Sequence, residues 1–434
     1  MQHTGTVIMK ARKTVTGATG MDYDHKGRIG LALGGGGSKG SYQLGAWQAF
    51  REEGIRFSAI AGTSIGSVNG AFMALDDYDG ACEMWENLRM DQCLAFLENR
   101  TVKSTDLISL KNAQLVLREL IAQRGLNTAP LRELLGRYIR EEDVRKSPIR
   151  YGLMTALFPN LNAAPRWIGD IPSGRLIDYI MASAGFPGLQ RVEIDGQRFL
   201  DGGFADNVPV SMLHDQGYSR IVAVDLGRHA RLESPLLDNV SITYIHSRTD
   251  LGGTFDTTPA ILARNRRLGY LDTRKAFGHL AGEHFAFWPD SWQTLVARFG
   301  TDNCRGFEQA AMAYDLDRGT VYTAEQFLDA IREQRKAAQL AYTSRRQALK
   351  IEHKIAAIRS GQLKVLRLLP PLKLAFLLEV TAKARQSGSK LSAPAHLFPN
   401  LNLAVQALCA LDGTVDGHLL YNGTQHDPDQ ERIP

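Results

Sequence analysis

AIAGTSIGSVNGAFMAL, residues 59–75, joins a short apolar run to a helix-like stretch rich in small residues. Between the two lies the pattern G-x-S-x-G, with Ser64 at its centre and Gly62 and Gly66 on either side. At a strand-to-helix turn this pattern can expose the serine hydroxyl as a nucleophile, because glycine relieves crowding where the backbone bends sharply. The free N–H groups at the start of the following helix add a partial positive charge. Alone the pattern is weak, so its weight depends on the motifs around it.

A second motif, GGGGSKG at residues 34–40, follows a strand-like run and precedes a helix-like stretch. Successive N–H groups in such a loop can bind an anion, which permits a nucleotide-phosphate loop, an oxyanion hole or a plain turn. Gly35, Gly37 and Gly40 satisfy G-x-G-x-x-G, but the next strand ends in the serine turn and not in an acidic residue. Lys39 precedes the last glycine, whereas a P-loop needs lysine after it. Beside the serine turn we favour the oxyanion hole.

The third motif is DGG at residues 201–203, which follows a predicted β-hairpin over 192–200 with its turn at Asp195-Gly196. A lone DGG is usually only a turn. Its place after a β segment, with Asn207 and Pro209 shortly beyond, favours a site residue at Asp201.

Taken in order, GGGGSKG, GTSIG, ASAGFPGL (182–189) and FLDGGFADNVPV (199–210) resemble the patatin-like phospholipase family, in its bacterial branch. The resemblance is collinear over about 28–226 and extends less closely to about 282. It implies an α/β fold of three layers with a mostly parallel central sheet. The chain beyond about residue 300 lies outside the resemblance, and its sequence predicts a helical C-terminal region. It also implies a hydrolase that cleaves acyl esters of lipids or phospholipids.

By this resemblance Ser64 is the nucleophile and Asp201 the base of a Ser–Asp dyad, and the backbone of Gly35, Gly36 and Gly37 supplies the oxyanion hole. Lys39 takes a basic position often held by arginine. The supporting glycines of the motifs are Gly40, Gly62, Gly66, Gly202 and Gly203. The chemistry needs no cofactor and no metal.

A dyad of this kind makes a physical demand on its aspartate. An unperturbed Asp has a pKa of about 3.9 and is a weak base at neutral pH. It must therefore gain from burial, from close contact with the serine and from oxyanion stabilisation. A triad would need a histidine, but His214 is predicted to lie at a helix end or on the surface, and His246 to be structural.

Two other functions stay open at this stage. An acyltransferase would use the same serine and pass the acyl group to an alcohol instead of water. A lipid-binding or partner-binding protein could keep the fold without turnover, although a loss of Ser64, Asp201 or the glycine loop would have favoured that reading.

The first half of the chain alternates strand-like and helix-like segments, which predicts a parallel α/β sheet. Strands are expected at 28–33, 59–61, 149–158, 167–172, 220–226 and 242–247. We expect a disordered extension over 1–27, an acyl hydrolase domain over 28–290 with its core at 28–230, and a mostly helical basic region over 300–434. The hexapeptide LFPNLN occurs at both 157–162 and 397–402, and the sequence offers no physical reason for the repeat.

The composition bears on the cellular location of the protein. The four cysteines show neither a disulfide framework nor a metal pattern, and no run of 18 apolar residues predicts a membrane span. The cysteine usage fits a reducing cytoplasm, so we expect a cytoplasmic protein, with peripheral membrane contact as a further possibility. The oligomeric state cannot be read from the sequence.

Charge is unevenly distributed along the chain. Residues 331–390 hold 14 Lys and Arg against three acids, a net charge of +11, while the whole chain carries +5. Apolar residues accompany the charge over 363–385, where Pro370-Pro371 excludes one continuous helix. This region predicts either an arm that contacts an anionic membrane or, slightly preferred, helices packed against a core with a solvated basic face. No nucleic-acid partner is expected, since no module's motif is present.

Overall fold

The computed structural model describes residues 28–89, 93, 126–186, 189–190, 192–227, 240–346, 371–386 and 399–413. The N-terminal extension 1–27 and the basic residues 347–370 lie outside the described residues. The chain divides into two compact units: unit 1 comprises 1–245 and 253–262, and unit 2 comprises 246–252 and 263–434. This division falls before the boundary near 290–300 that we expected.

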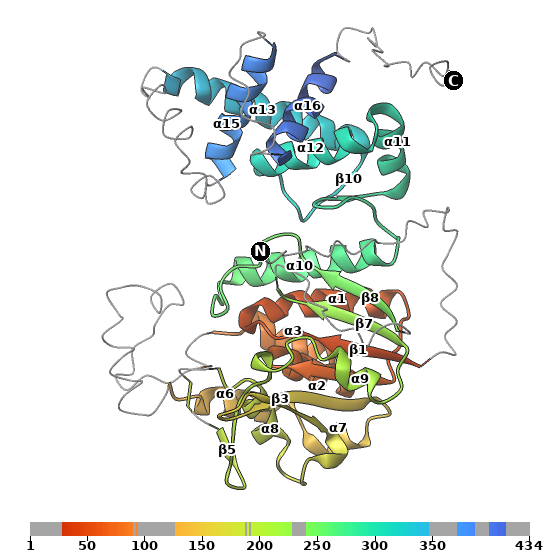
Figure 1. Cartoon of the computed structure of the whole chain (residues 1–434), viewed down its shortest axis with the longest axis vertical. Helices are drawn as coiled ribbons and strands as arrows, with labels where there is room; N and C mark the ends of the chain where they lie inside the picture. The colour runs from red at the N-terminus through yellow and green to blue at the C-terminus, as the bar shows by residue number, and fades with distance from the viewer. Residues whose placement is uncertain are drawn as a thin grey trace, which may run out of the picture. The chain divides into compact units, whose positions relative to one another are not determined.

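Unit 1 is built on one eight-stranded sheet with the order β5-β6-β3-β2-β1-β7-β8, and β4 pairs antiparallel with residues 152–157 of β3 (Figure 1). The strands are β1 (Ile29–Leu33), β2 (Ala59–Thr63), β3 (Arg150–Leu157), β4 (Asn162–Trp167), β5 (Val192–Ile194), β6 (Gln197–Asp201), β7 (Arg220–Asp225) and β8 (Ser241–His246). β1 pairs in parallel with both β2 and β7, and β2 pairs in parallel with β3. The predicted α/β class with a mostly parallel sheet is confirmed.

The central strands are buried on both faces, which explains why their sequences are apolar throughout and do not alternate. The N-terminal half of the sheet carries α1 (Ser41–Glu52), α2 (Ile65–Leu75) and α3 (Tyr78–Glu86), while α9 (Val210–His214) covers the opposite face of β1. Further along lie α6 (Ala129–Tyr138), α7 (Glu141–Lys146) and α8 (Leu176–Ser183). The helix-like stretches expected after the glycine loop and after Ser64 are confirmed as α1 and α2.

The antiparallel hairpin of β5 and β6 delivers Asp201 to the same end of the sheet as Ser64. Asp195 and Gly196 form its turn with φ of 51° and 77°, the left-handed values that a two-residue hairpin needs. β6 also pairs with β3, with Asp201 opposite Thr155. The predicted hairpin and its turn are confirmed.

The strand expected at 167–172 is wrong. Trp167 is the last residue of β4, and Ile168–Asp170 form a 3-10 turn in which the Asp170 carboxylate accepts the N–H of Trp167 over 3.1 Å. The local hydrogen bond of an aspartate competes with the strand ladder here.

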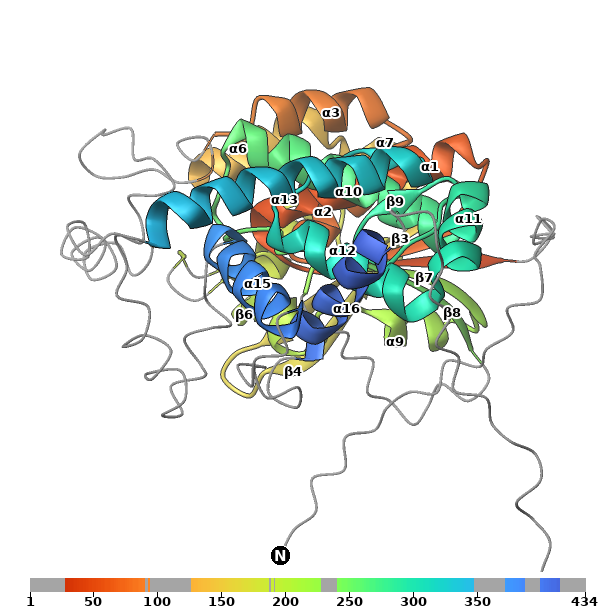
Figure 2. The same ribbon diagram turned by 90° about the horizontal axis from the view of Figure 1, so that it is seen from above.

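Unit 2 is mainly helical in the part that the structure describes. Its elements are the second part of α10 (Pro259–Ala276), β9 (Ala286–Phe287), α11 (Pro289–Phe299), α12 (Thr301–Ala313), β10 (Val321–Tyr322), α13 (Ala324–Arg346), α15 (Pro371–Gln386) and α16 (Pro399–Gly413). Figure 2 shows α15 and α16 beside α12, and these helices share one core with Phe307, Phe327 and Leu408 fully buried.

The basic region contributes to this core where it is described. Ala375, Leu378 and Ala382 of α15 are buried, as helices packed on a core predict. Arg335 of α13 pairs with Glu379 of α15 over 3.2 Å and with Asp412 of α16 over 2.7 Å. No helix among the described residues is long and apolar enough to cross a bilayer.

Candidate active site

Ser64 occupies the turn between β2 and α2, as the G-x-S-x-G pattern predicts. Its backbone has φ 54° and ψ −123°, a strained conformation for a residue with a side chain. α2 begins at the next residue, so its first N–H groups and the positive end of its dipole lie at the serine. The turn therefore holds the half-buried Ser64 at a sharp corner of the backbone.

Gly62 and Gly66 are needed at this turn for space. A Cβ atom on Gly62 would overlap the carbonyl of Gly66, and one on Gly66 would overlap the carbonyl of Leu33 in β1. Neither collision involves a movable side chain, so the tight approach of α2 to β1 and β2 permits no larger residue.

Asp201 lies beside Ser64 at the end of β6. Its carboxylate is 7% exposed and accepts the N–H of Gly203 over 2.7 Å. Burial raises the pKa of the Asp201 carboxyl above its ordinary value, while a hydrogen bond with the Ser64 hydroxyl and the Gly203 N–H act in the opposite direction. The structure thus brings the two residues together and makes the Asp201 carboxylate more basic than it would be in water.

The glycine loop, residues 34–40, lies against the serine turn. The N–H of Gly35 is already donated to the carbonyl of Asn207 over 3.1 Å, and the N–H of Ser38 to the carbonyl of Thr254 over 2.8 Å. Among the described residues, no hydrogen bond takes the N–H of Gly36 or Gly37. The N–H groups of Gly36 and Gly37 are therefore the candidate donors of this loop, because a distant carbonyl occupies the N–H of Gly35.

Gly35 contributes through its size instead. A Cβ atom there would lie 3.1 Å from Cβ of Ser64 and 2.8 Å from Oδ1 of Asn207. Its bare backbone lets the loop approach the serine side chain. Gly203 borders the same amide, since its Cβ would lie 2.9 Å from Oδ1 of Asn207.

The other motif residues fall around this centre. Lys39 is partly exposed in a 3-10 turn that spans Gly37–Gly40, and Gly40 is buried at the start of α1. Gly202 is buried where a side chain would overlap the carbonyl of Met154.

Three buried polar side chains, which we call the amide relay, hold both ends of the glycine loop. Gln43 of α1 donates to the carbonyl of Gly34 over 2.7 Å, and Asn69 of α2 donates to the carbonyl of Gly40 over 3.0 Å and to Oε1 of Gln43 over 2.8 Å. The indole N–H of Trp85 donates to Oδ1 of Asn69 over 2.9 Å. Since α2 also begins at Ser64, the relay fixes the loop relative to the serine.

The relay was not anticipated from the sequence. Its only signal is the presence of amide residues, Gln43 and Asn69, on helices with otherwise apolar or small neighbours. Buried amides of this kind are hydrogen-bonded, but the sequence does not name their partners.

An apolar cavity of about 380 Å³ opens onto Ser64 and Asp201. The glycine loop forms part of its wall, and most of the other lining residues are hydrophobic. The latter are Ile65, Val68, Met84, Trp85, Leu88, Leu131, Leu134, Leu135, Ala184, Phe186, Leu189, Phe204 and Phe255. Such a cavity accommodates a hydrocarbon chain with its polar end at the serine.

Neither histidine considered above is among the residues that line this cavity. His214 ends α9, and His246 ends β8. Within the described residues, no cluster of three or more His, Cys, Asp or Glu side chains could hold a metal ion.

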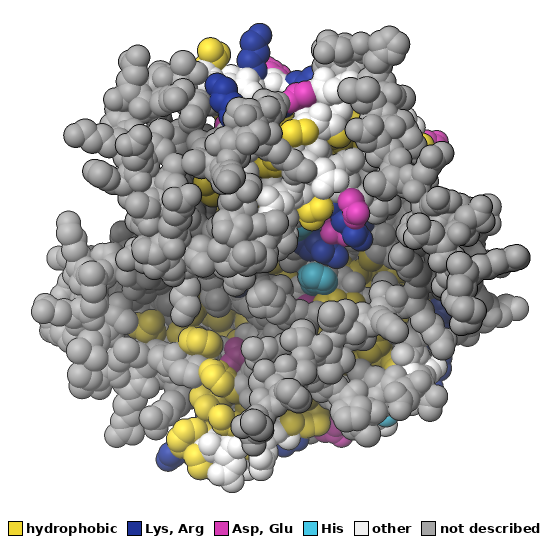
Figure 3. Space-filling model, turned by 45° about the horizontal axis from the view of Figure 1, so that its top comes forward, with side chains coloured by type: hydrophobic (Ala, Val, Ile, Leu, Met, Phe, Trp, Pro, Cys, Tyr) yellow, Lys and Arg dark blue, Asp and Glu magenta, His cyan; other side chains and the backbone are white. Residues whose placement is uncertain are grey.

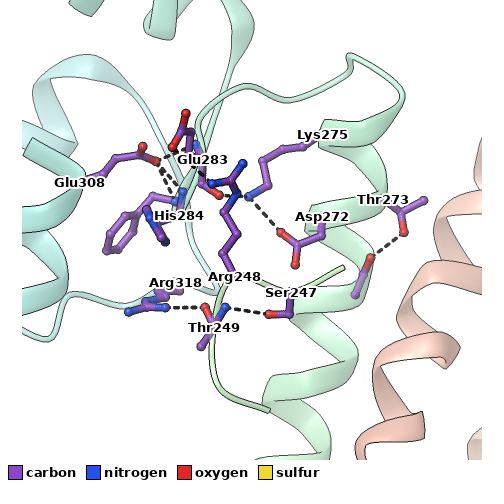
Figure 4. A network of polar contacts seen from close by, with 12 residues as sticks. Ser247, Arg248, Thr249, Asp272, Thr273, Lys275, Glu283, His284, Glu308 and Arg318 are labelled. Carbon is purple, nitrogen blue, oxygen red and sulfur yellow. Dashed lines mark hydrogen bonds and ion pairs between the residues drawn. The ribbon is translucent and has the colours of Figure 1, made fainter. Parts of the chain in front are cut away.

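Unit 2 contains a separate polar network, drawn in Figure 4. Glu308 of α12 is 1% exposed, and its Oε1 accepts the N–H groups of Glu283, His284 and Phe285, each over 2.9 Å. Burial, and next the charge of Arg318, lower the pKa of His284 to about 4. This arrangement anchors the loop before β9 to α12 and reads as structural.

Known proteins resemble part of this chain in sequence. Residues 31–214 match the family model described as Patatin-like phospholipase. A patatin-like phospholipase domain-containing protein of Caenorhabditis elegans, ZK370.4, is 28% identical over 203 residues, which are 46% of this chain and 14% of that protein. Lysophospholipase NTE1 of Saccharomyces cerevisiae is 33% identical over 203 residues, 46% of this chain and 11% of that protein.

The chain thus matches only a small part of these relatives' length. Among solved structures, VipD from Legionella pneumophila aligns over 90% of this chain and 86% of its own, with 14% identity and a TM-score of 0.38.

Proposed function

We propose that this chain is a serine acyl hydrolase of lipid esters, since residues 31–214 belong to the patatin-like phospholipase family. The observation that carries the proposal is the pairing of Ser64 with a buried Asp201 at the end of an apolar cavity. The acyl chain would occupy the cavity and place its ester carbonyl at Ser64.

In the first step Asp201 accepts the proton of the Ser64 hydroxyl while the oxygen attacks the ester carbonyl. The raised pKa of the Asp201 carboxyl supports this role, because a stronger base shares the proton more readily in the transition state. The protonated Asp201 then returns the proton to the leaving alcohol, and an acyl-serine remains. Water enters, loses its proton to Asp201 and releases the fatty acid by the same steps.

Negative charge develops on the carbonyl oxygen during each attack. The N–H groups of Gly36 and Gly37 are assigned to this oxyanion, and they are held in place before the reaction by the amide relay. One such donor is commonly worth about 10²–10³-fold in rate. Ser64 cannot add its own N–H, which is donated to Oγ of Ser183 over 2.9 Å.

Covalent labelling tests the assignment of the nucleophile. A serine-directed fluorophosphonate is expected to modify Ser64 in the wild-type protein, and Ser64→Ala is expected to lose both labelling and ester hydrolysis. Ser58→Ala serves as the matched control, because Ser58 lies at the opposite end of β2. Turnover that survives in purified Ser64→Ala would refute the proposal.

A further inference from the structure

Three phenylalanines from separate segments meet at the rim of the cavity, and we call them the aromatic rim. Phe186 follows α8, Phe204 closes the 3-10 turn after Asp201, and Phe255 lies in the 253–258 segment. The ring centroids of Phe186 and Phe204 are 6.0 Å apart, and those of Phe186 and Phe255 are 6.1 Å apart. All three side chains line the cavity that contains Ser64.

The rim is exposed although its residues line an apolar cavity. Phe186 is 43% and Phe204 44% exposed, which places them among the most exposed large hydrophobic side chains that are described. Isolated exposed apolar residues are ordinary, but rings in mutual contact at the mouth of a site mark a contact surface. Figure 3 shows hydrophobic side chains gathered on the lower left of the face it presents.

We propose that the aromatic rim docks on the acyl-chain region of a lipid surface, so that a lipid enters the cavity directly from that surface. The argument is continuity: Phe186 and Phe204 are at once the outer surface of the protein and the wall of the cavity. A hydrocarbon chain that moves from a bilayer to Ser64 along these rings is never exposed to water. Half-exposed phenyl rings gain free energy when a lipid phase covers them.

This inference rests on the proposed function for its lipid, but the binding can be measured without catalysis. Ser64→Ala protein is mixed with vesicles of zwitterionic phosphatidylcholine, and co-sedimentation is measured at low and high salt. Phe186→Ser and Phe204→Ser are each expected to weaken partitioning about tenfold, the loss for uncovering roughly half a phenyl side chain. Phe158→Ser is the matched control, since Phe158 is 40% exposed and does not line the cavity.

Salt distinguishes the rim from the basic residues of the C-terminal region. Binding through phenyl rings is expected to persist at high salt, whereas binding through Lys and Arg weakens as charges are screened. Loss of binding to neutral vesicles at high salt would therefore overturn the inference.

A second measurement covers variants that lose stability. Phe204→Trp and Phe158→Trp place an indole at the rim and at the control position, and quenching by brominated acyl chains reports insertion. Preferential quenching of the Trp at position 204 is expected, and equal quenching or none overturns the inference. A rim that instead joins two copies of the chain would show as a dimer that Phe204→Ser dissociates, which also overturns it. If Ser64→Ala binds vesicles through the rim but the wild type hydrolyses no ester, only the proposed function fails.

Discussion

The backbone N–H of Ser64 donates to the hydroxyl of Ser183 over 2.9 Å, and that hydroxyl donates to the carbonyl of Met154 over 2.7 Å. Ser183 is fully buried at the end of α8. Its side chain therefore ties the strained serine turn to β3 and satisfies an N–H group that would otherwise be buried without an acceptor.

Ser183→Ala is expected to lower kcat about 10-fold or more with little change in KM, because the turn loses one of the contacts that fix Ser64. The stability loss should be about 1–2 kcal/mol. Ser147→Ala is the matched control: Ser147 likewise accepts a backbone N–H, from Ile149, and donates to the carbonyl of Ala74. It should cost similar stability and leave kcat unchanged. Steady-state kinetics and thermal unfolding check both, and equal kinetic effects would contradict a positioning role.

Asp201→Asn should lower kcat/KM by about 10²–10⁴-fold, since an amide cannot accept the serine proton. In the wild type, the raised pKa of Asp201 means that the carboxylate takes up a proton at a higher pH than an ordinary aspartate. The acid limb of kcat/KM should therefore lie above pH 3.8. Asp206→Asn is the control, because burial also raises the pKa of Asp206 but its carboxylate bonds to Ser211. If Asp206→Asn shifted the acid limb of the pH–rate profile as much as Asp201→Asn does, the result would argue against the dyad.

Trp85→Phe keeps an aromatic wall in the cavity but removes the N–H that donates to Asn69. We expect kcat to fall several-fold, and Asn69→Ala to lower it further because the carbonyl of Gly40 also loses its donor. The double variant should be no slower than Asn69→Ala, since both changes break one relay. Trp47→Phe on α1 is the control. Additive losses in this cycle would show that the two residues act separately.

Unfolding should depend on pH through His284. Its pKa of about 4 lies below the ordinary 6.5, so the folded state prefers the neutral ring. Stability is then full above pH 6.5 and is lost as the pH falls toward 4, by about 3 kcal/mol at most. His284→Gln is expected to flatten this dependence in denaturant titrations at pH 7 and pH 5. If the free energy of unfolding of His284→Gln changed between pH 7 and pH 5 as much as that of the wild type, this histidine would be excluded as the cause.

The parts of the fold that could be predicted are those with local causes. Apolar runs bounded by glycine predicted β1 and β2, and the Asp-Gly turn predicted the β5–β6 hairpin. The positions of Ser64 and Asp201 at one end of the sheet follow from motifs that each lie within a few residues. The parallel-sheet rule places the glycine loop and Ser64 at the carboxyl ends of β1 and β2. It does not place Asp201, which ends an antiparallel strand and reaches Ser64 because it pairs with Thr155 of β3.

What the sequence could not predict depends on partners far along the chain. The carbonyl of Asn207 occupies the N–H of Gly35, and Ser183 occupies that of Ser64, although more than a hundred residues separate each pair. The repeated LFPNLN shows the same limit. Its first copy runs from the end of β3 to the start of β4, whereas Pro399–Asn402 begin α16. Tertiary packing decides between the two conformations.

The hairpin that carries Asp201 also has a meaning for the growing chain. Ser64 and the glycine loop leave the ribosome well before β6 is made. Asp201 can lie beside Ser64 only after β6 has paired with β3. A half-synthesised chain thus displays the serine turn without the carboxylate that would activate it. Under the proposed mechanism, a nascent or truncated product that lacks β6 has no base for Ser64, so acyl cleavage would begin only after β6 has joined the sheet.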